Sequence, residues 1–429
     1  MKFRCFGRRR PGELVRNEFF KVDKNTVWFP KLLIGAKLTD DEMEFLETHE
    51  TLSPNDKVKW VRFYGPLQEP RRPRRITVNN LALFLTTSCN LRCVYCYGSG
   101  GEIDLPDLTL EEIEAFLKVF KTARGIMFHG WGEPTLRFDL IREVVKKHGR
   151  RYQYSIGTNG VYGSSRHRVE IARFLAENKF GVTLSLDSIP EINDRQRPRA
   201  NGEGSTAEVL ETMRVFKKYG VQFGVRAGVS AGGLDYMEDF LYFMKKLGVR
   251  GFKIEPVFES GRARRERDKS EFARMPDLLE FGRNLVGIWK LGQKIGVKVD
   301  STYLPFKVRR SFCGATEGSC LVLYNTRLIG TCWEEMLNPS SPFVVGKMEK
   351  SNGDYRVFIF RDRLERLHER SHIALEDERC RRCPLKYSCS GGCPFKSYEH
   401  YGDLEHPGEN PQSCRARREV LKLILSGEP

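Results

Sequence analysis

The sequence predicts an α/β protein whose core is a curved parallel sheet, closed into a full or partial barrel. Between residues 81 and 300, six short apolar runs alternate with stretches in which apolar residues recur at helical spacing. Strands that alternate with helices form βαβ units, and such units build parallel sheets. The chain has 429 residues, which is enough for this core and for smaller regions on either side.

The strands are expected where apolar and β-branched residues gather. They are LALFLTT at 81–87, GIMFHG at 125–130, YQYSIGT at 152–158, GVTLSLD at 181–187, VQFGVRAGV at 221–229 and GFKIEPV at 251–257. Helices are expected at 108–121, 137–148, 166–177, 205–219, 234–247 and 271–294. In the first helix, Thr109 and Glu112 have the spacing of a capping box.

Two regions flank this core. Residues 1–80 mix apolar pairs with basic loops, and 38–50 has the pattern of a short helix. Residues 301–429 contain short segments, glycines and most of the cysteines, followed by a helix at 417–425. Because a domain with few regular elements usually needs metal to hold it together, we expect an irregular, cysteine-rich C-terminal domain here. The expected domains are therefore 1–80, 81–300 and 301–429.

Composition limits the location and the partners of the chain. No stretch approaches the ~20 apolar residues of a membrane span, and the N-terminus lacks the apolar segment of a secretory signal. We therefore expect a cytoplasmic protein without a membrane partner. The net charge of +16 favours an acidic partner, such as nucleic acid, an acidic peptide or an acidic electron-transfer protein. Each of the basic runs at 8–10, 71–75 and 261–269 is a candidate binding patch, but we favour their interpretation as solvated loops and linkers.

The 12 cysteines are strongly clustered. Three follow the first strand at 89–96, the last eight fall within 313–414, and Cys5 stands alone as a plain thiol. In a cytoplasmic chain, this number and arrangement indicate metal or redox chemistry rather than disulfides.

Cys89, Cys93 and Cys96 share one loop at the C-terminal end of the first strand, where parallel α/β folds place their active sites. Thiolates select zinc or iron–sulfur clusters. No further Cys or His follows in the sequence before His129, so a nearby fourth ligand for zinc is missing. Three thiolates suit a [4Fe–4S] cluster with one open iron, which can bind a substrate or cofactor.

This loop and the motif GWGEP at 130–134 resemble the radical S-adenosylmethionine (SAM) enzymes. The resemblance implies a partial (β/α)6 TIM-like barrel. It also implies that the open iron chelates SAM, and that reductive cleavage of SAM yields a 5′-deoxyadenosyl radical that abstracts hydrogen from an unactivated carbon.

The same resemblance implies the residues that contact SAM. Glu133 belongs to the element that binds the SAM amino group, while Ser185 and Arg197 match the residues that hold its ribose and carboxylate. Asp187 can instead form a local ion pair, and Arg226 can be a core-edge arginine. The implied contacts are Tyr95, Gly130, Gly132, Glu133, Pro134, Thr158, Asn159, Ser185, Asp187, Arg197 and Arg226.

The C-terminal cysteines include the run C-x₂-C-x₅-C-x₃-C, which resembles the SPASM extension of radical SAM enzymes. Eight cysteines can close two [4Fe–4S] clusters, or alternatively two Cys₄ zinc ribbons. With the SAM-binding cluster, the first possibility gives three clusters. The resemblance assigns Cys313, Cys320, Cys332 and Cys393 to one auxiliary cluster and Cys380, Cys383, Cys389 and Cys414 to the other.

A SPASM extension implies modification of a peptide or protein, and we expect maturation of a ribosomal peptide through a thioether, a carbon–carbon cross-link or a related change. Residues 1–80 are a candidate for binding a leader peptide. The positive charge would suit an acidic electron donor such as a ferredoxin.

Other functions remain open. The sulfatase-maturating branch, which makes formylglycine, has an Asp base after the third auxiliary cysteine. Here Trp333 follows Cys332, which leaves Glu334 and Glu335 as candidate bases. Further alternatives are modification of a haem precursor or metallopterin, or of a nucleic acid. A zinc-stapled nucleic-acid-binding protein would leave the βα series and GWGEP unexplained.

Overall fold

The computed structural model describes residues 20–22, 24, 26–30, 34–37, 76–309, 311–335 and 337–426. The helix predicted at 38–50 and the lone Cys5 lie outside the described residues, so both stay predictions.

The described residues contain an 11-stranded sheet in the order β10-β9-β8-β7-β6-β5-β4-β11-β12-β13-β14. Its first seven strands pair in parallel. They are β4 (Asn80–Phe84), β5 (Gly125–His129), β6 (Gln153–Thr158), β7 (Gly181–Ser185), β8 (Phe223–Val229), β9 (Gly251–Pro256) and β10 (Lys298–Asp300). The six predicted strands are confirmed. The short β10, which continues the sheet beyond β9, was not predicted.

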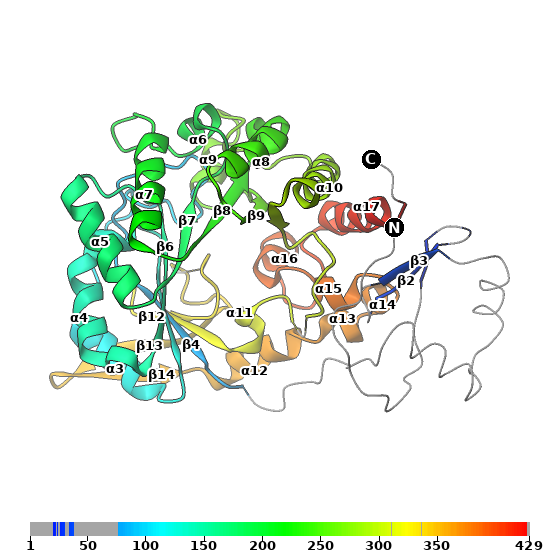
Figure 1. Ribbon diagram of the computed structural model, residues 1–429. Helices are drawn as coiled ribbons and strands as arrows, with labels where there is room; N and C mark the ends of the chain where they lie inside the picture. The colour runs from blue at the N-terminus through cyan, green and yellow to red at the C-terminus, as the bar shows by residue number, and fades with distance from the viewer. Residues whose placement is uncertain are drawn as a thin grey trace, which may run out of the picture.

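The predicted helices follow these strands and cover one face of the sheet, as α3, α4, α5 and α7 show in Figure 1. They are α3 (Leu110–Val119), α4 (Phe138–His148), α5 (Ser165–Glu177), α7 (Thr206–Tyr219), α8 (Met237–Lys246) and α10 (Leu278–Ile295). Shorter helices are η1 (Pro134–Arg137), η2 (Gly149–Arg151), α6 (Pro190–Gln196), η3 (Ala231–Tyr236) and α9 (Arg262–Glu266). The capping box is present, because Thr109 Oγ1 accepts from the Glu112 amide and Glu112 accepts from the Thr109 amide.

Residues of β5–β9 alternate between a buried face and a more accessible one, whereas Leu81–Phe84 of β4 are buried on both faces. On β5, Ile126 and Phe128 are buried in the core beneath the helices, while His129 is only half-buried. On β8, Val225 is buried and Arg226 is exposed. Because the helices cover the buried face, the accessible residues line the concave side of the barrel, which is therefore open.

The C-terminal region continues the same sheet. Strand β11 (Cys320–Leu323) pairs in parallel with β4, and β12 (Leu328–Gly330), β13 (Val344–Ser351) and β14 (Asp354–Ile359) follow antiparallel. Arg327, in the turn between β11 and β12, donates to Glu112 of α3 at 2.8 and 3.0 Å. This extension of the sheet was not predicted from the sequence.

The remaining cysteines lie on and between short helices. These are α11 (Gly314–Glu317), α12 (Arg361–Arg370), α13 (Ile373–Glu376), α14 (Glu378–Arg381), α15 (Lys386–Cys389), α16 (Pro394–Tyr401) and α17 (Pro411–Ser426). The last helix packs against α10, where Val420 approaches Gly282. The helix predicted at 417–425 thus exists and begins earlier.

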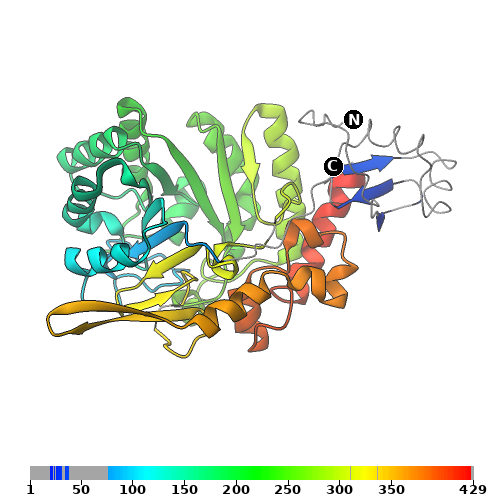
Figure 2. The ribbon, with the colours of Figure 1, turned by 90° about the horizontal axis from the view of Figure 1, so that it is seen from below.

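A small antiparallel sheet of β1 (Phe20–Lys21), β2 (Thr26–Phe29) and β3 (Ile34–Lys37) lies beside α17, as both Figure 1 and Figure 2 show. Trp28 packs against Leu385 and Leu421, and its indole N–H donates to the Pro384 carbonyl at 2.9 Å. The N-terminal strands are therefore anchored on the cysteine-rich region. None of the helices that the structure describes has the length and apolar character of a membrane span.

Candidate functional site

The loop after β4 brings Cys89, Cys93 and Cys96 into one pocket. The Cys89 sulfur accepts from the Leu91 amide at 3.4 Å, and the Cys96 sulfur accepts from the Gly100 amide at 3.4 Å. Burial, together with the neighbouring Cys93, Glu133 and Cys96, raises the pKa of Cys89 to about 12. Burial raises the pKa of Cys93 to about 11, with Cys96 adding to the effect. The three thiols are thus close enough to influence one another.

This donor set fits an iron–sulfur cluster. Backbone N–H groups aimed at sulfur are the hydrogen bonds that stabilise thiolate ligands of such clusters. A cationic iron core would also replace the protons that burial keeps on the thiols. Within the described ranges, no three His, Cys, Asp or Glu side chains converge closely enough to hold a single metal ion. The ligand roles of these cysteines therefore stay predictions.

Two arginines hold the cysteine loop in place. Arg92 donates to the carbonyls of Cys89 and Gly101 at 2.8 and 2.9 Å. Arg262, on α9, donates to the carbonyls of Cys93 and Gly100 at 2.7 and 3.0 Å. Each guanidinium therefore fixes two points of the loop.

Arg262 was not recognised from the sequence, because it lies in the basic run 261–269. The interpretation of that run as solvated is right for Arg264, Arg265 and Arg267, which are exposed and ion-paired. It is wrong for Arg262, which is 5% exposed. A possible signal was Gly261, which has φ +55° and where a Cβ would lie 2.0 Å from the Tyr97 carbonyl oxygen.

The GWGEP motif packs directly against the start of the cysteine loop. A Cβ on Gly132 would lie 2.2 Å from the Ser88 carbonyl oxygen, so only glycine fits. The Glu133 carboxylate is buried and accepts from the Thr158 hydroxyl at 2.8 Å and from the Asn159 amide at 2.7 Å. It thereby ties the end of β5 to the end of β6. Its side chain is satisfied internally, which leaves the motif's backbone to face a ligand.

Asp187 is the centre of a second buried network. Its carboxylate accepts from the Tyr95 hydroxyl, from the Gly228 amide at 2.9 Å and from Gln196 Nε2 at 3.1 Å. Arg197 donates to the Tyr95 hydroxyl at 2.6 Å and lies 3.8 Å from Asp187. Asp187 therefore forms the local ion pair that the sequence left open, and it fixes the ring of Tyr95.

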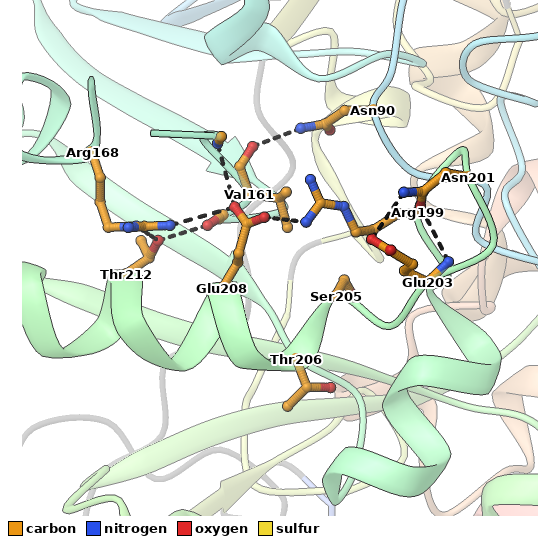
Figure 3. A network of polar contacts seen from close by, with 12 residues as sticks. Asn90, Val161, Arg168, Arg199, Asn201, Glu203, Ser205, Thr206, Glu208 and Thr212 are labelled. Atoms are coloured by element: carbon orange, nitrogen blue, oxygen red, sulfur yellow. Dashed lines mark hydrogen bonds and ion pairs between the residues drawn. The ribbon is translucent and has the colours of Figure 1, made fainter. Parts of the chain in front are cut away.

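Figure 3 shows the polar contacts that join the loops behind the cysteines. The Glu208 carboxylate of α7 accepts from Arg199 and, at 3.4 Å, from Arg168. Leu91 of the cysteine loop pairs with Arg199 in an isolated antiparallel bridge, and Asn90 Nδ2 donates to the Val161 carbonyl at 2.6 Å. The cysteine loop is thus fixed to the loops that follow β6 and α6.

Ser185 and Arg226 face each other across β7 and β8, at the accessible side of the sheet. The Arg226 guanidinium forms no hydrogen bond or ion pair with any residue that the structure describes. Burial and the charge of Arg226 lower the pKa of His129 to about 4. His129 Nδ1 accepts from the Gly130 amide at 2.8 Å, and its ring lies 4.3 Å from that of Trp333. The concave face therefore presents an unpaired cation beside a neutral imidazole.

The two candidate bases have different surroundings. Glu334 accepts from the Ser260 hydroxyl at 3.3 Å. Burial raises its pKa, while Lys396 and Arg226 oppose that rise. Glu335 instead accepts from the Asn338 amide at 3.2 Å, within its own turn. Only Glu334 lies with the residues of the concave face.

Four C-terminal cysteines form one group. Burial and the neighbouring Cys313 raise the pKa of Cys320 to about 12. Burial, Glu334 and Cys393 raise the pKa of Cys332, and Cys313 adds to the effect. Cys332 therefore lies near Cys313 and Cys393, and Cys320 lies near Cys313, although these residues come from widely separated segments.

The other four form a second group. Burial, together with Cys389, Cys383 and Cys414, raises the pKa of Cys380 to about 12. Burial raises the pKa of Cys414 to about 11, with contributions from Cys389 and Cys383. The division of the eight cysteines between two clusters, which the resemblance implied, stays a prediction.

The comparisons with known proteins agree with this geometry. The sequence profile of the Radical SAM superfamily matches residues 83–247. The uncharacterized protein MJ0907 of Methanocaldococcus jannaschii is 30% identical over 214 residues, which cover 48% of this chain and 70% of that protein. The chain belongs to the radical SAM superfamily. It is therefore an enzyme that uses a [4Fe–4S] cluster and SAM.

Other relatives of this radical SAM enzyme extend beyond the barrel. A cysteine-type anaerobic sulfatase-maturating enzyme of Clostridium perfringens is 25% identical over 336 residues, covering 72% of this chain and 86% of the relative. The structure of anSMEcpe with AdoMet and the Cp18Cys peptide matches with a TM-score of 0.59 and 21% identity, over 82% of this chain and 98% of that one. The structure of SuiB of Streptococcus suis, bound to the precursor peptide SuiA, matches with a TM-score of 0.56 and 14% identity. The match covers 92% of this chain and 98% of that one. The fold class and the resemblance to radical SAM enzymes with a SPASM extension are confirmed.

Proposed function

We propose that this radical SAM enzyme abstracts a hydrogen atom from a residue of a peptide or protein, and that it matures a ribosomal peptide. The proposal rests above all on the accessible polar concave face, which extends from the cysteine loop to Trp333 and Glu334. Arg226 offers an unpaired positive charge on this face, where a substrate can lie next to the cofactor. The printed names of the relatives, a sulfatase-maturating enzyme and a protein bound to its precursor peptide, favour the same substrate class.

Cys89, Cys93 and Cys96 would hold the SAM-binding cluster, with one iron left open for SAM. When bound, the cluster and SAM supply the radical that removes hydrogen from an unactivated carbon. The proposed SAM contacts are Tyr95, Gly130, Gly132, Glu133, Pro134, Thr158, Asn159, Ser185, Asp187, Arg197 and Arg226.

The chain's own groups suggest how these residues act. Arg226 and the neighbouring Ser185 hydroxyl together suit a carboxylate, because a guanidinium forms strong charge-assisted hydrogen bonds with one. The backbone carbonyls of the GWGEP motif can accept from an ammonium group. Glu133 and Asp187 would act by position, since their carboxylates join neighbouring loops.

The eight C-terminal cysteines would hold two closed [4Fe–4S] clusters, which makes three clusters in all. These auxiliary clusters would accept the electron left after hydrogen abstraction or anchor the substrate. The net charge of +16 favours an acidic electron donor such as a ferredoxin. Because reduced cysteines need a reducing compartment, we expect the enzyme to work in the cytoplasm. Residues 1–80 remain a candidate for binding a leader peptide.

The proposal is tested with the anaerobically reconstituted full-length enzyme, SAM, a chemical reductant, and peptides encoded in the neighbouring reading frames. Each peptide carries deuterium at its candidate carbons. We expect deuterium to appear in 5′-deoxyadenosine and the peptide to lose that deuterium, both measured by mass spectrometry. If 5′-deoxyadenosine forms but takes no deuterium from any peptide, the enzyme acts on another class of substrate.

A second candidate function is formylglycine formation on a sulfatase-type peptide, with Glu334 as the base. Its position beside the concave face and the sulfatase-maturating relative favour this candidate. Loss of a base lowers a rate by roughly 10²–10⁴-fold. Glu334→Gln should therefore reduce peptide oxidation by about that factor while 5′-deoxyadenosine still forms. Glu335→Gln is the matched control and should have little effect, since Glu335 only caps its own turn.

A further inference from the structure

The described residues contain four buried arginines, and one of them differs from the rest. Arg168 pairs with Glu208, Arg262 with Glu102 and Arg417 with Glu409, at 3.4, 2.7 and 2.7 Å. Arg370, at the end of α12, is 5% exposed and forms no ion pair with any Asp or Glu that the structure describes.

The hydrogen bonds of Arg370 do not balance its charge. Nη2 donates to the carbonyls of Gly391 and His406 at 3.2 and 2.9 Å. Nε is buried and has no partner among the described residues. An arginine stays protonated in proteins, so a buried guanidinium without an anion is costly. The surroundings of Arg370 must therefore supply negative charge in the working protein.

The neighbours of Arg370 are cysteines from both C-terminal groups. Burial lowers the pKa of Arg370, and Cys380, Cys393, Cys389 and Cys313 raise it. Gly391, whose carbonyl Arg370 binds, stands between Cys389 of one group and Cys393 of the other. A Cβ on Gly391 would lie 3.1 Å from Arg370 Nη1, so the glycine lets the guanidinium approach closely. Arg370 thus lies between the two groups.

We propose that Arg370 is a shared counter-cation for both auxiliary clusters, a positioning residue that neutralises them and directs its free N–H toward a cluster sulfur. This inference rests on the proposed function, because it requires two clusters in the C-terminal region. Four thiolates outweigh the positive charge of a [4Fe–4S] core, so each closed cluster is an anion. A nearby cation and a hydrogen bond to sulfur both favour the reduced, more negative state. Arg370 therefore raises the reduction potential of both clusters together.

The test compares four proteins, all full-length and reconstituted anaerobically in a Cys89→Ala/Cys93→Ala/Cys96→Ala background, so that only the auxiliary clusters contribute. Arg370→Met removes the charge and keeps a long side chain, while Arg370→Lys keeps the charge. Arg366→Met, one turn earlier on α12, removes an exposed arginine that pairs with Glu405. Iron and sulfide are counted first, and the clusters are then titrated potentiometrically with detection by electron paramagnetic resonance.

We expect the background protein to contain about eight irons, from two four-iron clusters. At a fixed potential, Arg370→Met should lower the ratio of reduced to oxidised cluster about tenfold for both clusters, which equals about 59 mV for a one-electron couple. Arg370→Lys should recover most of that shift, and Arg366→Met should show none. Unchanged potentials in Arg370→Met, or a shift in only one cluster, would overturn the proposal.

Two further outcomes separate this inference from the proposed function. If the background protein holds no auxiliary clusters, the proposed cluster count fails, and the role of Arg370 fails with it. If Arg370→Met cannot hold iron, the thermal stability of the metal-free proteins decides. Because the substitution removes an unbalanced buried charge, metal-free Arg370→Met should be at least as stable as the metal-free background protein. Lower stability would show that Arg370 is simply structural.

Discussion

The cysteine loop of the barrel and the cysteine-rich C-terminal region hold their cysteines in position in different ways. Cys89, Cys93 and Cys96 lie on one short loop, which backbone N–H groups, Arg92 and Arg262 hold in place. Among the C-terminal cysteines, Cys380, Cys383 and Cys389 are close in sequence, whereas Cys313 and Cys332 approach Cys393 only through tertiary structure.

This difference indicates where metal is needed for folding. A loop with many hydrogen bonds to the protein can keep its shape without metal. Short helices that meet around four thiols would gain ligand bonds to the metal in addition to their packing, so we expect metal binding to contribute to their folding. We therefore expect removal of a cysteine to abolish SAM cleavage at the barrel site. At the C-terminal sites, we expect it to unfold the surrounding region.

The largest expected effect is the contrast between Cys93→Ala and Cys393→Ala. Cys93→Ala should abolish SAM cleavage and leave the C-terminal region resistant to protease, because the loop is held by other contacts. Cys393→Ala should make that region protease-sensitive, because one ligand of a closed set is lost. Release of 5′-deoxyadenosine and limited proteolysis measure the two properties. Identical behaviour of the two variants would remove the distinction between the sites.

The C-terminal region also depends on the N-terminal strands. Trp28 is 2% exposed and packs on Leu385 and Leu421. Trp28→Ala should destabilise the protein by about 3 kcal/mol or more, because it opens a cavity and frees the Pro384 carbonyl. Denaturant unfolding measures this loss. Trp289→Ala is the control: Trp289 is half-buried against Phe306, so its loss should be smaller. An equal loss in both variants would contradict this anchoring role.

The barrel loop should respond to loss of its buried arginine. Arg262→Met leaves the Gly100 carbonyl without its side-chain donor and the Cys93 carbonyl with only the Cys96 amide, which should cost about 2 kcal/mol and reduce the iron bound at the SAM site. Arg265→Met is the matched control, because Arg265 pairs with the same Glu102 from an exposed position. Thermal unfolding and iron analysis follow both effects. If Arg265→Met behaves like Arg262→Met, the carbonyl contacts have no special role.

The smallest expected effect concerns pH. The pKa of His129 falls from the usual 6.5 to about 4 in the folded protein, through burial and the charge of Arg226. Between these values the unfolded chain binds more protons, so stability falls as the pH falls from 6.5 to 4 and is fully present above 6.5. Because the ring is only half-buried, we expect a loss of about 1 kcal/mol. Unfolding measured across this interval should show less acid loss in His129→Phe, and an unchanged profile would exclude His129 as the cause.

The sequence predicted the parallel core because each of its elements can be recognised from a short stretch of residues. Each strand and its following helix carry their own periodicity, and the three cysteines lie on one loop. Strand β10 was missed because its three residues are too few to show a pattern. Strand β11 was missed because its pairing with β4 joins residues more than two hundred positions apart.

The same limit applies to the site. Glu133 and Asp187 were singled out from the sequence as SAM contacts, which stays a prediction, but their internal hydrogen bonds depend on loops from several strands. Arg262 and Arg370 look in the sequence like other members of arginine-rich segments. What distinguishes them is burial, which only the packed structure reveals.

The most direct test of the central claim is the iron and sulfide content of the full-length enzyme and of its Cys89→Ala/Cys93→Ala/Cys96→Ala variant, measured together with SAM cleavage. One open site and two closed sites predict about twelve irons in the first protein and about eight in the second, from four-iron clusters. They also predict that only the first protein releases 5′-deoxyadenosine. Stoichiometric zinc in place of iron, or SAM cleavage by the triple variant, would contradict the account.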